Sequence, residues 1–100
     1  MKNLLGKRVV ARFDRAGVFY GTLESVCDEY VTLTNVRRLH HWHKVAGGTT
    51  GIAHATKFED GQQFSGYVDE LVLLKSNLIE FNKCSDDAIR EIEKIKSWIV

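Results

Sequence analysis

A cluster of cationic and aromatic side chains occupies the segment 36–44, which reads Val-Arg-Arg-Leu-His-His-Trp-His-Lys. It holds two arginines, three of the chain's four histidines and one of its two tryptophans. Guanidinium groups form paired hydrogen bonds with phosphate oxygens, imidazole nitrogens donate or accept hydrogen bonds, and an indole offers a face on which a base can stack. These residue types together favour a binding site for a flat anion, of which a nucleotide is the simplest example.

Alternation along an extended strand divides this cluster between two faces, with Arg38, His40 and Trp42 on one and Arg37, Leu39, His41 and His43 on the other. We expect the first face to bind the ligand, because it joins a charge, a hydrogen-bonding ring and a stacking surface, and it leaves Leu39 for the core. The alternative is an exposed polar edge strand with Leu39 and Trp42 in the core, since charged residues commonly protect sheet edges.

Further candidates come from the preceding strand and the turn before it. Phe19 and Tyr20 must place one ring on each face, so one ring is expected in the core and the other in a pocket wall. Arg12 and Arg15 flank the turn and add two cations. The full candidate set for ligand binding is Arg37, Arg38, His40, His41, Trp42, His43, Tyr20, Phe19, Arg12 and Arg15.

Motifs of known enzyme classes are absent from the sequence: it has no G-x-S-x-G, P-loop, Rossmann glycine pattern or H-E-x-x-H. We therefore predict a binding protein without catalytic residues or a cofactor. Two alternatives involve the histidines. His41 and His43 have a spacing that can bind a metal, with His54 or Cys27 as further ligands, but no second ligand pair supports such a site, and none is predicted. The same two imidazoles could act as acid and base on a phosphodiester.

Length and composition predict one domain, 1–100, because 100 residues with 44% hydrophobic content suffice for one core. Neither a secretion signal nor an apolar run of 18 residues is present, which predicts a cytoplasmic protein that does not enter a membrane. Residues 1–44 carry eight Lys/Arg against four Asp/Glu, and residues 45–100 carry six against nine. The basic first half suits an anionic partner, but its net charge of +4 is small for a general DNA binder.

The pattern of the first half predicts strands over 7–13, 18–26 and 30–34, joined by polar turns as an antiparallel meander, with the basic segment continuing or pairing with the third. Gly21 is expected at a bulge or corner. Two more strands are expected over 67–74 and 78–81. The predicted fold class is α+β, either a small bent antiparallel β-sheet or an SH3-like or Sm-like barrel.

Two helices complete this prediction. The first is short and spans 52–58, with Thr49 or Thr50 as its cap and a turn or loop over 59–63 after it. The second is a C-terminal amphipathic helix capped by Ser85, in which Ile89, Ile92, Ile95 and Ile99 form one apolar stripe. We expect Ile92 and Ile95 to be buried.

The segments 7–12, 16–23 and 31–39, together with Trp42, resemble a family of small uncharacterised proteins encoded by tailed bacteriophages. The resemblance extends over most of the chain, and its specific portions read A-G-V-x-x-G-T-L and R-R-x-x-x-W. The family has no biochemical assignment. Small phage proteins without catalytic motifs are often anti-defence factors, and one class consists of homo-oligomeric sponges that sequester nucleotide immune signals.

By analogy, the resemblance implies a phage anti-defence protein that sequesters a cyclic ADP-ribose-like or cyclic dinucleotide signal in the host bacterial cytoplasm without cleaving it. A homo-oligomer would complete the pocket between subunits. Two other functions remain open. The strand order also resembles Sm-like and SH3-like barrels, which predicts an RNA-binding module. The third possibility is an inhibitor that binds a host protein.

Overall fold

Six antiparallel strands form one sheet in the computed structural model, which describes residues 2–42, 48–58 and 62–97. The strands in chain order are β1 (Arg8–Phe13), β2 (Gly17–Val26), β3 (Tyr30–His41), β4 (Gln63–Phe64), β5 (Val68–Leu74) and β6 (Leu78–Lys83). They are ordered β4-β3-β2-β1-β6, and β5 also pairs with β3. This arrangement confirms the predicted α+β class with a bent antiparallel sheet.

The long strand β3 lies inside the sheet rather than at its edge. One side of β3 pairs with β2, and its other side pairs first with β5 and then with β4. The interpretation of this segment as an exposed polar edge strand is therefore wrong. Gly21 marks a register shift in the β2–β3 ladder, as expected, because a Cβ atom there would lie only 3.1 Å from the carbonyl oxygen of Thr34.

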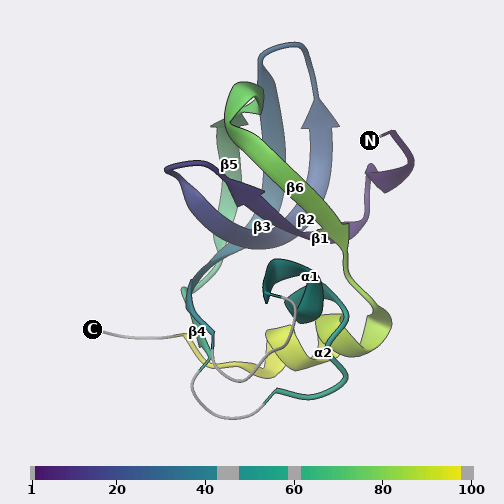
Figure 1. Ribbon diagram of the computed structural model, residues 1–100, viewed down its shortest axis with the longest axis vertical. Coiled ribbons are helices and arrows are strands. Elements are labelled where there is room, and N and C mark those ends of the chain that lie inside the picture. The colour runs from purple at the N-terminus through teal and green to yellow at the C-terminus, as the bar shows by residue number, and fades with distance from the viewer. Residues whose placement is uncertain (1, 43–47, 59–61, 98–100) are drawn as a thin grey trace.

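The last two strands are neighbours in the chain, but they pair with different strands of the sheet. The 3-10 turn Lys75–Asn77 connects β5, which pairs with β3, to β6, which pairs with β1. The sheet consequently curls on itself (Figure 1). No hydrogen-bonded ladder joins β5 to β6 among the described residues, so the sheet is open and not a closed barrel.

Helices α1 (Gly48–Ala53) and α2 (Asp86–Lys94) lie together against one face of the sheet (Figure 1), and a 3-10 turn, Lys2–Leu4, precedes β1. The prediction of a helix over 52–58 was wrong in position. The helix ends at Ala53, whose carbonyl oxygen accepts a hydrogen bond from the amide of Ser85 at 2.9 Å. Helix α2 begins as predicted, since the Ser85 hydroxyl accepts a hydrogen bond from the amide of Ala88 at 3.1 Å.

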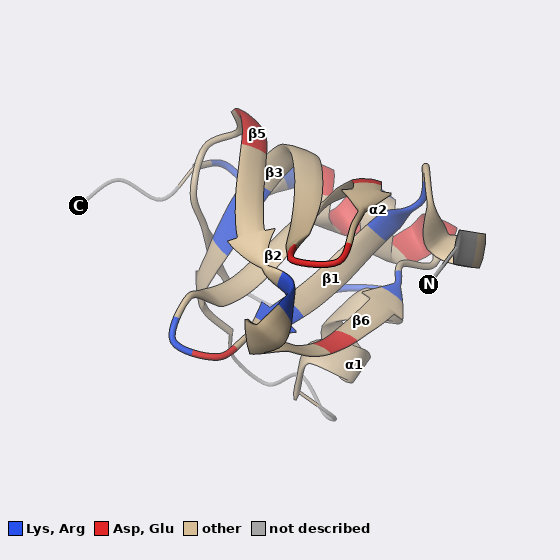
Figure 2. Ribbon diagram, turned by 90° about the horizontal axis from the view of Figure 1, so that it is seen from above, with Lys and Arg blue, Asp and Glu red and all other residues tan. Residues whose placement is uncertain are grey.

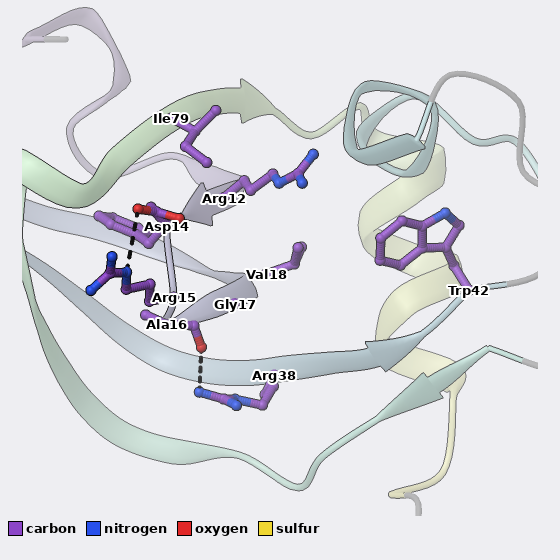
Figure 3. A pocket seen from close by; sticks show the side chains of 10 residues that line it. Arg12, Asp14, Arg15, Ala16, Gly17, Val18, Arg38, Trp42 and Ile79 are labelled. Atoms are coloured by element: carbon purple, nitrogen blue, oxygen red, sulfur yellow. Dashed lines mark hydrogen bonds and ion pairs between the residues drawn. The ribbon is translucent and has the colours of Figure 1, made fainter.

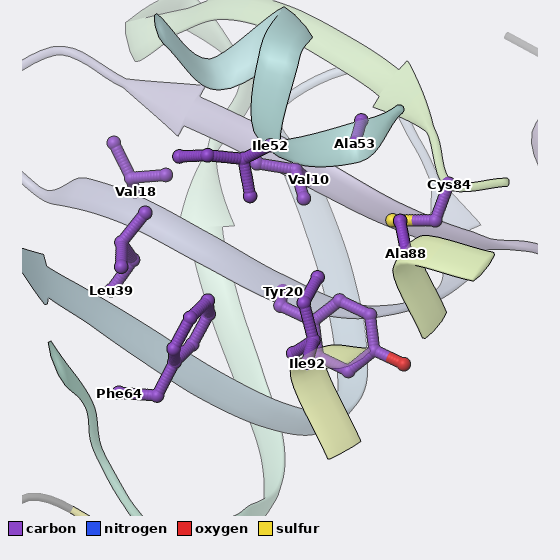
Figure 4. Packing of buried hydrophobic residues seen from close by; sticks show 10 residues of the cluster. All are labelled: Val10, Val18, Tyr20, Leu39, Ile52, Ala53, Phe64, Cys84, Ala88 and Ile92. Carbon is purple, nitrogen blue, oxygen red and sulfur yellow. The ribbon is translucent and has the colours of Figure 1, made fainter. Parts of the chain in front are cut away.

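Alternating residues of β1 and β2 supply two separate hydrophobic clusters. The helix-side core lies between the sheet and the two helices (Figure 4), and it contains Val10, Val18, Tyr20, Leu39, Ile52, Ala53, Phe64, Cys84, Ala88 and Ile92. The opposite cluster lies on the other side of the sheet and contains Val9, Ala11, Phe13, Phe19, Leu23, Val31, Leu33, Val36 and Leu73. Both faces of the central strands are thus covered.

The two cysteines are free and lie in different surroundings. Cys84 is buried in the helix-side core, and this burial raises the pKa of its thiol to about 12, whereas Cys27 is exposed. Within the described part of the chain, no helix combines the length and the apolar character that crossing a bilayer would require.

Candidate functional site

The turn between β1 and β2 forms the centre of the candidate site. Arg15 and Gly17 have positive φ angles of 64° and 121°, which reverse the chain within the three residues that separate the strands. The amide of Asp14 donates a hydrogen bond to the carbonyl oxygen of Asn77 at 2.6 Å, which ties this turn to the connection between β5 and β6. The turn is therefore fixed to the connection between β5 and β6.

An open cleft of about 420 Å³ surrounds this turn (Figure 3). We call it the first cleft. Residues in or next to β1, β2, β3 and β6 line it: Arg12, Phe13, Asp14, Arg15, Ala16, Gly17, Val18, Arg38, Trp42 and Ile79. Four members of the sequence-predicted site, namely Arg12, Arg15, Arg38 and Trp42, are thus brought to one cleft. Its volume lies within the range of about 300 to 1,000 Å³ that is usual for small-molecule sites.

Arg38 reaches the first cleft from β3. Its Nη2 atom donates a hydrogen bond to the carbonyl oxygen of Ala16 at 2.6 Å, and its guanidinium carbon lies 5.0 Å from the ring centroid of Phe19. Gly17 lies next to the Arg38 guanidinium group, since a Cβ atom at Gly17 would lie 3.6 Å from the guanidinium carbon. The cation is thereby fixed in place while the side chain remains exposed.

The two other arginines of the cleft are more open. The guanidinium group of Arg12 makes no hydrogen bond or ion pair within the described residues, although Arg12 lies opposite Glu80 in the β1–β6 ladder. Arg15 lies 4.0 Å from a carboxylate oxygen of Asp14 in an exposed pair, which contributes little binding energy. Three arginines against one aspartate leave the first cleft cationic. Among the acidic residues of the chain's second half, four lie on α2 and the other described ones lie on β5 and β6 (Figure 2).

Trp42 lines the first cleft but lies on a different face from the one expected. It follows the end of β3, is half-buried and packs against the helix-side core. Strand β3 ends at His41, and its ladder with β4 shifts register between Leu39 and His41, so the alternation that groups Trp42 with Arg38 and His40 does not extend to Trp42. The indole therefore bounds the cleft on the side towards the helices (Figure 3).

Arg37 is the exception among the predicted arginines. It is 1% exposed, its Nε atom donates to the carbonyl oxygen of Ser65 at 2.8 Å, and its Nη1 atom donates to that of Ile92 at 2.6 Å. The guanidinium carbon lies 5.2 Å from the ring of Phe64 and 5.1 Å from that of Tyr67. Desolvation lowers the pKa of Arg37, and a hydrogen bond with Tyr67 opposes this change. These contacts give Arg37 a structural role and correct its expected place on a ligand surface.

Tyr20 also has a structural place. It is buried in the helix-side core, and its hydroxyl donates a hydrogen bond to Oε2 of Glu93 at 2.7 Å. The same oxygen accepts from Arg8 at 3.2 Å, and the Arg8 guanidinium lies 4.8 Å from the Tyr20 ring. Burial raises the pKa of Tyr20, with the Glu93 hydrogen bond as the next cause. Of the pair Phe19 and Tyr20, only Phe19 lies beneath a cleft, in contact with Arg38.

A second cleft of about 310 Å³ lies where β3, β4 and β5 meet, and it is lined by Phe19, Val36, Arg38, His40, Ser65, Val68 and Leu71. His40 therefore lines a different cleft from Trp42, whereas Arg38 lines both clefts. His41 is exposed at the end of β3, and His43 lies outside the described residues. No group of three His, Cys, Asp or Glu side chains able to hold a metal ion occurs among the described residues.

Comparison with known proteins gives a family for the chain. The model of a domain of unknown function, DUF6948, matches residues 6–92. The chain belongs to the DUF6948 family. The match covers the sheet, both clefts and most of α2. No curated protein and no solved structure matches the chain.

Several residues of the two clefts were missed from the sequence. Ile79 and Asp14 line the first cleft, and Ser65, Val68 and Leu71 line the second. Asp14 was identifiable as a turn residue, but nothing in its local pattern indicates that β6 brings Ile79 beside it. Residues of β5 join the second cleft only because β5 pairs with β3. These members depend on strand pairing over long sequence separations.

Proposed function

We propose that this protein binds a nucleotide-type anion in the first cleft and sequesters it without cleaving it. The observation that supports this proposal is the lining of one open cleft by Arg12, Arg15, Arg38 and the indole of Trp42. Phosphate oxygens accept charge-assisted hydrogen bonds from guanidinium groups, and an aromatic wall suits a flat ring. Arg12 supplies a guanidinium group that needs to break no ion pair with a described residue before it contacts the ligand.

The proposal extends to a biological setting. The resemblance of residues 16–23 and of Arg37, Arg38 and Trp42 to a family of tailed-phage proteins supports an anti-defence role in the host cytoplasm. In that setting the ligand is an immune signal of the cyclic ADP-ribose or cyclic dinucleotide type. Sequestration requires tight binding and slow release, and it requires no catalytic group.

The binding test uses isothermal titration calorimetry with ADP-ribose and a cyclic dinucleotide. Replacing Arg12 with glutamine is expected to weaken binding about 10- to 100-fold, because one charge-assisted hydrogen bond contributes about 1.5 to 3 kcal/mol. Arg90→Gln is the matched control, since Arg90 is an exposed arginine on α2 that pairs with Asp87 outside the cleft. Unchanged affinity in both Arg12→Gln and Arg38→Gln would contradict the proposed site.

The fate of the ligand is tested in the same samples. After incubation with excess ligand and denaturation of the protein, chromatography is expected to recover the ligand intact, with about one equivalent bound per site. Conversion of more ligand molecules than there are protein molecules would show catalysis and overturn the sequestration proposal.

A homo-oligomer is part of the proposal, and it is supported by an apolar strip on the outer face of β3 and β5. Tyr30, Val72 and Leu74 are 45%, 51% and 49% exposed, and Tyr30 is paired with Leu74 across the ladder. We expect light scattering at micromolar concentration to give a multiple of the 11.4 kDa chain mass. Leu74→Lys should reduce that mass because it places a charge in the strip. A parent protein of 11.4 kDa would count against assembly.

RNA binding is the second candidate function. It is supported by the sequence of the A-G-V-x-x-G-T-L strand, the turn after it and the V-x-L-x-N strand, which resembles that of Sm-like and SH3-like proteins. An RNA partner predicts affinity that rises with oligonucleotide length and falls steeply with salt. A mononucleotide partner predicts neither a length dependence nor competition by short RNA.

A further inference from the structure

Two arginines of the first cleft, Arg12 and Arg38, lie on opposite faces of the sheet. Alternation along β1 places Val10 in the helix-side core, so Arg12, two residues later, lies on the helix side as well. Arg38 lies on the other face, where its guanidinium group contacts Phe19 of the opposite cluster. The first cleft therefore wraps around the end of the β1–β2 hairpin, with one cation on each side of it (Figure 3).

The strand order sets the distance between these two cations. Neighbouring strands lie about 4.8 Å apart, so β1 and β3, which have β2 between them, are separated by roughly 10 Å. The hydrogen bond to Ala16 and the contact with Phe19 hold the Arg38 guanidinium on its own face. Arg12 and Arg38 are thus placed to bind two separate anionic groups rather than one.

The two sides of the cleft differ in the residues beside each cation. Trp42 packs against the helix-side core, so its indole lies on the same side of the sheet as Arg12. Beside Arg38 the lining consists of Ala16 and Gly17. The small size of these two residues leaves room for a sugar to pass the end of the hairpin between the two cations.

We propose that the first cleft selects nucleotides whose two phosphate groups are separated by a sugar. One phosphate binds Arg12 beside the indole on which the base stacks, and the other binds Arg38 on the far side of the hairpin end. The inference rests on the function proposed above and names its ligand class. Of the two kinds of immune signal considered there, a cyclic dinucleotide has separated phosphates, whereas the phosphates of the ADP-ribose type are contiguous.

Three probes separate the spacing of the phosphates from their total charge. ADP and adenosine 3′,5′-bisphosphate share the base and the sugar, but ADP carries both phosphates at one end of the ribose and the bisphosphate carries one at each end. Cyclic diadenylate also has separated phosphates, although it carries less charge than ADP. Calorimetry gives two ratios for each variant, in which the dissociation constant of ADP is divided by that of each separated-phosphate probe.

Substitutions of the two arginines should change these ratios differently. Arg38→Gln is expected to lower both ratios about 10-fold, because it removes the cation that only the separated phosphates reach. Arg12→Gln should weaken all three probes by a similar factor and thus preserve the ratios. Arg38→Lys should restore part of the preference, since it returns a cation to the same face. Arg90→Gln on α2 is the control that should change no affinity. A folding defect that affects all probes equally leaves the ratios unchanged.

The outcomes distinguish this inference from the proposed function. If all three probes bind and depend on Arg12, but Arg38→Gln leaves both ratios at the parent values, no second phosphate binds Arg38 and only the inference is overturned. A ratio that falls for the bisphosphate alone would show that the preference follows charge, with the same consequence. Equal affinity of the parent protein for ADP and the bisphosphate would also overturn it. If no probe binds, the proposed function fails and the inference fails with it.

Discussion

Replacing Arg37 with methionine is expected to destabilise the fold by about 3 to 5 kcal/mol, measured as the free energy of unfolding in urea. Methionine retains much of the side-chain volume but provides no donors. The carbonyl oxygens of Ser65 and Ile92 would lose the guanidinium that bonds them, and each buried acceptor left unpaired costs about 1 to 3 kcal/mol. The cation–π contacts of Arg37 with Phe64 and Tyr67 would also be lost.

Arg38→Met is the matched control for this experiment, because it makes the same chemical change at the next residue on the exposed face. Its effect on stability should stay near 1 kcal/mol, since Arg38 contributes one hydrogen bond from an exposed position. Ligand affinity should show the opposite order. At a temperature where both variants are folded, Arg38→Met should bind the ligand more weakly than Arg37→Met. If Arg37→Met unfolds at the same urea concentration as the parent, the structural role assigned to Arg37 is wrong.

The contrast between these adjacent arginines shows what the sequence can and cannot predict. Alternation along β3 correctly places Arg37 and Arg38 on opposite faces and Leu39 in the core. Which arginine is buried depends on partners that lie 28 and 55 residues away in the chain, at Ser65 and Ile92. Neither partner is visible in a local pattern, because the acceptors are backbone carbonyls that every residue type carries.

The elements themselves were predictable where the local signal is strong. Alternating β-branched residues identify the first three strands, and a serine cap with two aspartates identifies the start of α2. Strand β4 was missed because two residues are too short for a periodic signal, and it exists only through its pairing with β3. Likewise Arg8 carries no motif, although it links β1 to Glu93 of α2.

Arg12, Arg15, Arg38 and Trp42 line one cleft, and their arrangement there follows from topology. Arg12 and Arg38 lie on strands that flank β2, and the β1–β2 turn brings Arg15 between them. The sequence predicts one ligand face on β3. The structure instead shows two clefts, because the chain leaves β3 before Trp42 and carries the indole to the helix side.

Replacing Ile92 with alanine is expected to reduce the free energy of unfolding by about 3 to 5 kcal/mol, in the upper part of the range for a fully buried isoleucine. Ile92 is 0% exposed, and it packs in the helix-side core with Val10 and Tyr20. A cavity there would loosen α2 at the turn whose carbonyl oxygen accepts the hydrogen bond from Arg37. The substitution thus weakens the same junction between helix and sheet as Arg37→Met does.

Ile95→Ala provides the comparison, because both isoleucines were expected to be buried and the structure buries only Ile92 fully. Ile95 follows the last residue of α2, has extended backbone angles and is only partly buried at the margin of the helix-side core. Since it removes less apolar surface from water, its replacement should cost about 1 to 2 kcal/mol. Urea unfolding of both variants measures the difference directly. Equal losses would mean that the apolar stripe of the C-terminal helix continues through Ile95, and a loss below about 1 kcal/mol for Ile92→Ala would mean that α2 does not close the core.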